Sequence, residues 1–74
     1  MSKLPQVRPK DLVRALEKAG FSKDRQDGSH VFLKHSDGRL TSVSIHSRPV
    51  PKGTLRAILR QTKIKTEDLI KLLK

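Results

Sequence analysis

Apolar residues recur at helical spacing near the start of the chain. The positions that would share one helical face are Leu12, Ala15, Leu16 and Ala19. Pro9 lies where a proline is tolerated in a first helical turn, and Gly20 is suited to the position just past a helix end. The pattern therefore predicts a helix within residues 8–21.

Two Asp-Gly pairs divide the middle of the chain into stretches that are typical of strands. The pairs occupy positions 27–28 and 37–38, and Asp-Gly is a strong signal for a two-residue hairpin loop because it accepts a positive φ. Two hairpins in series form a meander. The sequence thus predicts three antiparallel strands, over residues 21–26, 29–35 and 40–45.

The last third of the chain returns to a helical period after a loop. Pro49 and Pro51 lack the amide donors that a central strand needs, so the segment SRPVPKG is predicted to be a loop. A helix is predicted over residues 54–63, with Thr54 as its N-cap. Its apolar stripe consists of Leu55, Ile58 and Leu59. A short third helix is expected to follow, with Thr66 as its N-cap.

This order of elements predicts an α+β fold, with helices packed on one face of a three-stranded antiparallel sheet. The order α-β-β-β-α, with a short extra C-terminal helix, matches the topology of double-stranded RNA-binding domains. The chain has 74 residues and no internal repeat or linker. We therefore expect one domain over residues 1–74.

Composition and charge narrow the classes of function. The chain has no cysteine, which excludes disulfides, thiolate metal sites and a cysteine nucleophile, and which fits a cytoplasmic protein. No stretch approaches the length that spans a bilayer. Lys and Arg number 17 against 7 Asp and Glu, giving a net charge of +10. This excess favours a polyanionic partner, with nucleic acid ahead of a membrane surface.

A basic row on the second helix is the first candidate for nucleic-acid contact. Lys52, Arg56 and Arg60 recur every four residues and so share one helical face. The segment between Val43 and Thr66 contains no acidic residue, so we predict contacts from this row to RNA phosphates. A merely solvated basic face is the alternative interpretation. The absence of Tyr and Trp argues against single-strand binding by aromatic stacking.

His30 is the candidate catalytic residue, because it begins a predicted strand directly after a Gly-Ser turn. A simple two-residue hairpin register would place it opposite Arg25 on the first strand and Ile45 on the third. A cationic and an apolar neighbour both disfavour the protonated imidazole, which would leave the side chain able to accept a proton. The alternative is a histidine at a strand end that makes an ordinary hydrogen bond.

The other two histidines have weaker predictions. His35 precedes the second turn and is expected to be solvated. His46 follows the third strand and is a candidate for a second acid or base, or for a phosphate contact. His30 and His35 are an odd number of residues apart, so they would point to opposite sheet faces, and no carboxylates converge with them. We therefore expect neither a metal nor another cofactor.

Two stretches, GFSKDRQDGSHVFLKHSDGR and VSIHSRPVPKGTLRAILRQTKI, resemble the HicA toxin family of toxin–antitoxin systems. The most specific pieces are GSH with an aromatic residue two positions on, the DGR turn, and KGTLRAIL. The sequence departs from the family where Ser44 replaces a common proline and where QTKI replaces a helix end that usually contains glycine. The resemblance implies a double-stranded-RNA-binding-like fold, a translation-independent mRNA endoribonuclease with His30 as catalytic residue, and a HicB antitoxin that covers the active site.

These observations together predict a metal-independent ribonuclease of the cytoplasm. His30 would remove the proton of a substrate 2′-hydroxyl, and Arg25, Lys34 or the basic row would stabilise charge on the phosphorane. The alternative is a non-catalytic RNA-binding module of the same fold. A DNA-binding protein is a third and weaker interpretation, because no turn-linked pair of helices precedes a recognition helix.

Overall fold

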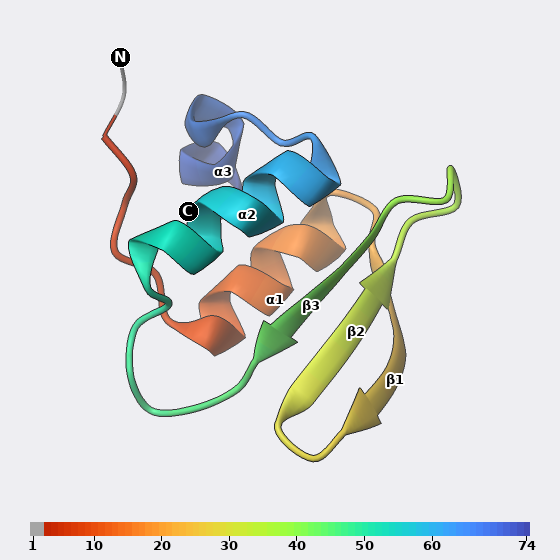
Figure 1. Cartoon of the computed structure of the whole chain (residues 1–74). Coiled ribbons are helices and arrows are strands. Elements are labelled where there is room, and N and C mark those ends of the chain that lie inside the picture. Colours follow the sequence, from red (N-terminus) through yellow and green to blue (C-terminus); the bar gives the residue numbers. More distant parts are fainter. Residues whose placement is uncertain (1–2) are drawn as a thin grey trace.

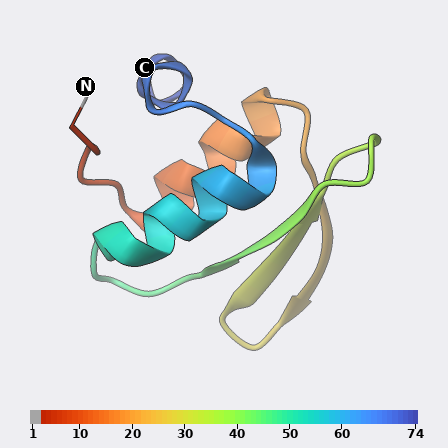
Figure 2. The ribbon, with the colours of Figure 1, turned by 45° about the horizontal axis from the view of Figure 1, so that its top comes forward.

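The computed structural model describes residues 3–74. Its elements are α1 (Pro9–Lys18), β1 (Ser22–Asp27), β2 (His30–Lys34), β3 (Leu40–Ser44), α2 (Lys52–Thr62) and α3 (Thr66–Leu72). The strands form one antiparallel sheet of order β1-β2-β3, and the helices lie over one of its faces (Figures 1 and 2). This arrangement confirms the predicted α+β fold and its order of elements.

The core lies between the sheet and the helices. Side chains of β2 and β3 alternate, so that Val31 and Leu33 on β2 and Val43 on β3 are buried against the helices. Leu16 of α1 and Leu55 of α2 are fully buried on the other side of this core. No helix covers the opposite face of the sheet in the part of the chain that the structure describes, and we call it the open face.

The end of α1 follows the prediction for Gly20. Gly20 has a φ of 101°, and its N–H donates to the carbonyl of Glu17 at 3.0 Å, while the N–H of Phe21 donates to the carbonyl of Leu16 at 3.0 Å. This pair of bonds is the Schellman motif, which satisfies the last carbonyls of a helix. It turns the chain so that Phe21 enters the core immediately before β1.

The predicted N-caps of the other two helices are wrong. α2 begins at Lys52, two residues before Thr54, with Pro51 as its N-cap, because the amide of Leu55 already donates to the carbonyl of Pro51 at 2.8 Å. α3 includes Thr66 as its first residue and has Lys65 at the N-cap. Neither helix has a side-chain hydrogen bond at its cap, so backbone geometry sets both beginnings.

Both hairpin loops differ from the predicted two-residue Asp-Gly loops. In the first hairpin Asp27 pairs with His30, so the loop is Gly28-Ser29, and Gly28 supplies the positive φ of 61° at its first position. In the second, the carbonyl of His35 accepts the N–H of Gly38 at 2.9 Å and the N–H of His35 donates to Arg39 at 2.9 Å. This is a three-residue loop that ends in a glycine with φ 97°.

A β-bulge changes the direction of side chains along β1. The pairing register shifts between Lys23 and Arg25, which leaves Asp24 as the extra residue. Phe21 lies in the core, and in an unbroken strand a residue four positions later would face the same side. The bulge reverses this alternation, so Arg25 pairs with Phe32 on the open face.

Candidate functional site

The open face carries three of the residues that the sequence singled out. His30, Phe32 and Lys34 alternate on β2 with the buried Val31 and Leu33, and therefore point away from the helices. The cross-strand partners that share this face are Ser22, Arg25 and Asp27 on β1 and Leu40, Ser42 and Ser44 on β3. The structure thus places His30, Arg25 and Lys34 on a single surface.

The immediate neighbours of His30 are not the predicted ones. Asp27 of β1 and Ser44 of β3 pair with His30, in place of Arg25 and Ile45. The reason is the position of the two loops, since each loop shifts the register of its hairpin. The expectation of a neutral imidazole rested on the wrong neighbours, and the exposed His30 has a carboxylate and a hydroxyl beside it instead.

Arg25 and Phe32 form a contact pair next to this histidine. The guanidinium carbon of Arg25 lies over the Phe32 ring at 4.3 Å from its centroid, a distance typical of a cation–π contact. Phe32 is only partly buried. Phe32 follows His30 by two positions on the same strand, so the pair and the imidazole are adjacent on the open face.

The basic row of Lys52, Arg56 and Arg60, which we call the α2 row, lies elsewhere. All three side chains are exposed, and with Lys3 and Lys65 they line a groove on the helix layer whose apolar lining is Leu4, Leu59 and Ile64. α2 packs on the helix-covered face of the sheet (Figure 2). The sheet therefore separates the α2 row from His30, and the two sets of residues form two surfaces.

The other histidines divide in the same way. His35 is not solvated as predicted: its side chain is 21% exposed, and its ring meets the edge of Phe21 at 5.1 Å between centroids. His46 is exposed and lies two residues after Ser44, the cross-strand neighbour of His30. Its Nδ1 accepts the N–H of Arg48 at 3.3 Å.

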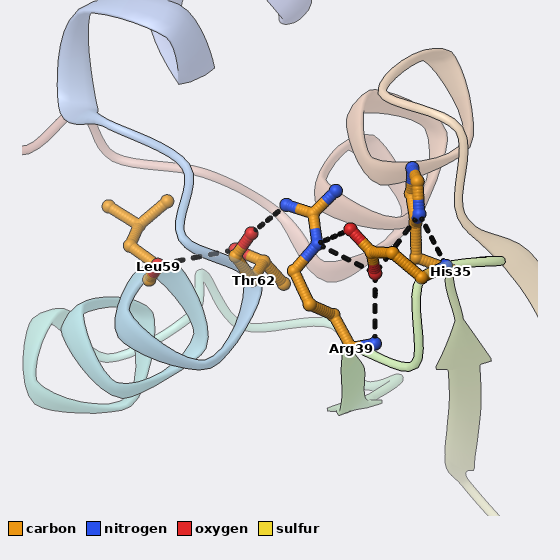
Figure 3. A network of polar contacts seen from close by, with 5 residues as sticks. His35, Arg39, Leu59 and Thr62 are labelled. Atoms are coloured by element: carbon orange, nitrogen blue, oxygen red, sulfur yellow. Dashed lines mark hydrogen bonds and ion pairs between the residues drawn. The ribbon is translucent and has the colours of Figure 1, made fainter.

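The DGR motif has a structural role that the sequence analysis missed. Arg39 Nε donates to Asp37 Oδ2 at 2.8 Å, and its guanidinium also donates to the carbonyl of Thr62 near the end of α2 (Figure 3). The same guanidinium lies 5.1 Å from the centroid of the Phe21 ring. Arg39 therefore joins the β2–β3 loop to α2 and to the start of β1. These hydrogen bonds also lower the pKa of Asp37.

Two further searches bear on the class of function. Among residues 3–74, no group of three or more His, Asp or Glu side chains is placed to hold a metal ion. Within the same range, every helix is too short or too polar to cross a membrane.

Comparison with known proteins gives one family. Residues 9–64, which run from the first residue of α1 to just past α2, match the model of the HicA toxin of bacterial toxin–antitoxin systems. No curated protein matches the chain. The matched segment contains the GSH turn, the DGR loop and the α2 row, and it covers well over half of the sequence. The chain belongs to the HicA toxin family.

Proposed function

We propose that this toxin is a metal-independent endoribonuclease that cleaves mRNA with His30 as its general base. The observation that carries the proposal is the position of His30, exposed on the open face with Arg25 and Lys34 on the same surface. RNA can approach this face without displacing a helix. Membership of the family makes the chain the toxin of a toxin–antitoxin system and implies an antitoxin partner.

The chemistry uses the 2′-hydroxyl of the substrate. His30 takes the proton, the resulting alkoxide forms a bond to the adjacent phosphorus, and the bond from phosphorus to the 5′-oxygen breaks. The products are a 2′,3′-cyclic phosphate and a 5′-oxygen that receives a proton from His46 or from water. General-base catalysis contributes roughly 100- to 10,000-fold, which suits a slow nuclease.

The corrected register gives His30 a candidate positioning residue. Asp27 is its cross-strand partner, so the carboxylate lies beside the imidazole on the open face. A carboxylate that accepts the N–H of one ring nitrogen fixes the tautomer and leaves the other nitrogen free to take a proton. We assign this orienting role to Asp27.

The two basic surfaces have different roles in this proposal. Arg25 and Lys34 lie near the scissile phosphate and stabilise the charge that develops on it. The α2 row is on the helix layer, so it holds phosphates of the same RNA away from the cleaved bond. Within residues 3–74 none of its three side chains forms an ion pair, which leaves them free to bind an anion.

Product analysis of a His30 variant tests the proposal. The full chain and His30→Gln are incubated with RNA in excess EDTA, and the 3′ ends are examined. We expect the wild type to give cyclic phosphates and His30→Gln to lose at least about 100-fold in rate, with unchanged RNA affinity and unfolding free energy. His46→Gln is the control that separates a base from a helper.

Two results would contradict this assignment. Full activity of His30→Gln at equal folded concentration would remove His30 as the base. RNA binding by the wild type without any cleavage would instead favour the non-catalytic RNA-binding module, for which the α2 row, remote from His30, is sufficient.

A further inference from the structure

Phe32 is the one aromatic residue of this chain that lies outside the core. The sequence has two Phe and neither Tyr nor Trp, and Phe21 is buried. Phe32 points to the open face, where its partner on β3 is the small Ser42. With a strand rise of about 3.3 Å per residue, it lies roughly 7 Å along β2 from His30, a separation that one nucleotide spans.

The side chain above this ring is held by stacking, with no ion pair to an acidic residue. The guanidinium of Arg25 lies 4.3 Å from the Phe32 centroid, and no ion pair joins Arg25 to an acidic side chain among the described residues. The bulge at Asp24 places Arg25 on this face. A side chain needed only as a positive charge would not require this alignment on an aromatic ring.

We propose that the Arg25–Phe32 pair is a binding site for an unpaired nucleobase next to the phosphate cleaved at His30. The inference rests on the proposed function. The base stacks on the outer plane of the guanidinium, whose inner plane lies on Phe32, as bases of single-stranded RNA stack on aromatic and guanidinium planes. A base inside a duplex cannot do this, so the site selects single-stranded RNA and determines which nucleotide lies beside His30.

This role for Arg25 differs from a simple phosphate contact, and the difference is measurable. Lys keeps the charge of Arg but has no plane. Stacking of one base is worth roughly a 5- to 150-fold change in affinity. Arg25→Lys therefore separates the two roles: it retains a phosphate contact and destroys a stacking site.

The test uses a short single-stranded RNA that carries one 2-aminopurine, whose fluorescence falls when it stacks. The protein is the full chain with His30→Gln, so that the RNA stays intact. We expect quenching on binding, and we expect Arg25→Lys and Phe32→Leu each to lose it together with roughly 5- to 150-fold in affinity. Leu40→Ser, which alters an exposed apolar residue elsewhere on the face, is the control and should keep both.

Three further outcomes decide the matter. Phe32→Tyr keeps a ring and should retain the quenching, which excludes misfolding as the cause of the loss in Phe32→Leu. Unchanged affinity and quenching in Arg25→Lys would overturn the stacking site. If the wild type cleaves an RNA with an abasic nucleotide at every tested position as fast as the intact RNA, the stacking site fails while the ribonuclease stands. Failure of the wild type to bind or cleave any RNA overturns both.

Discussion

Gly20 occupies a position that other residues do not fit. Its φ is 101°, and a Cβ built there would lie 2.9 Å from Nε2 of His35. We expect Gly20→Ala to lower the free energy of unfolding by about 1–2 kcal/mol, because an L-residue is strained at positive φ. Gly53→Ala is the matched control: its Cβ would meet nothing within 4 Å, and alanine favours the helix. Urea denaturation of both variants would measure the difference, and equal effects would contradict the argument.

At the level of single residues, the sequence predicted which side chains matter better than it predicted their neighbours. The GSH motif identified His30 as an exposed residue at the start of a strand, and the structure agrees. It did not identify Asp27 as the cross-strand partner, because an Asp-Gly-Ser segment allows either of two adjacent pairs to form the loop. The choice is made by the pairing of both strands, which local turn propensity does not determine.

At the level of elements, the β2–β3 loop gives a prediction about pH. The usual pKa of Asp37 is 3.8, and the side-chain and then the backbone hydrogen bond from Arg39 lower it. A carboxyl group with a lowered folded-state pKa contributes stability above its unfolded pKa, and this contribution is lost as the pH falls through the folded-state value. The wild type should therefore be more stable than Asp37→Asn at neutral pH, and the gap should close below 3.8. Urea unfolding of both proteins along a pH series measures it, and a gap that persists at the lowest pH would refute the role of Asp37.

The elements also show where a sequence pattern stops being informative. Helical periodicity and Gly20 located α1, and the proline loop located the approach to α2, because these signals are local. The bulge at Asp24 left no local signal: no glycine marks it, and it follows from placing Phe21 in the core while Asp27 and His30 close the hairpin. The caps at Thr54 and Thr66 failed because Pro51 and Lys65 already set the helical backbone.

At the level of the whole molecule, the separation of the two basic surfaces predicts separate kinetic effects. Replacing Arg56 and Arg60 with Gln should weaken RNA binding and reduce the salt dependence of the affinity by about 0.7 for each lost phosphate contact on a single strand. The cleavage rate at saturating RNA should not change, because the sheet separates these residues from His30. Lys71 and Lys74, exposed near the C-terminus, give a control double variant of equal net charge. A lower rate at saturation, or the same loss in the control, would contradict the separation.

The net charge also constrains the antitoxin. We propose that a HicB-like partner covers the open face with an acidic surface, since a protein of charge +10 associates fastest with the opposite sign. Co-expression with the neighbouring gene product followed by co-purification should give an inactive complex that forms more slowly as salt increases. A complex that leaves His30-dependent cleavage intact would disprove coverage of this face.

The bulge in β1 has a second consequence, for contacts between copies of the toxin. β1 is an edge strand with all six residues exposed, and a flat edge of this kind invites strand pairing with another molecule and then aggregation. Asp24 breaks the regular spacing of that edge, and Lys23, Arg25 and Asp27 add charges along it. The residue that directs Arg25 onto the open face thus also discourages edge-to-edge association, which keeps copies of a strongly basic toxin apart at the times when no antitoxin covers them.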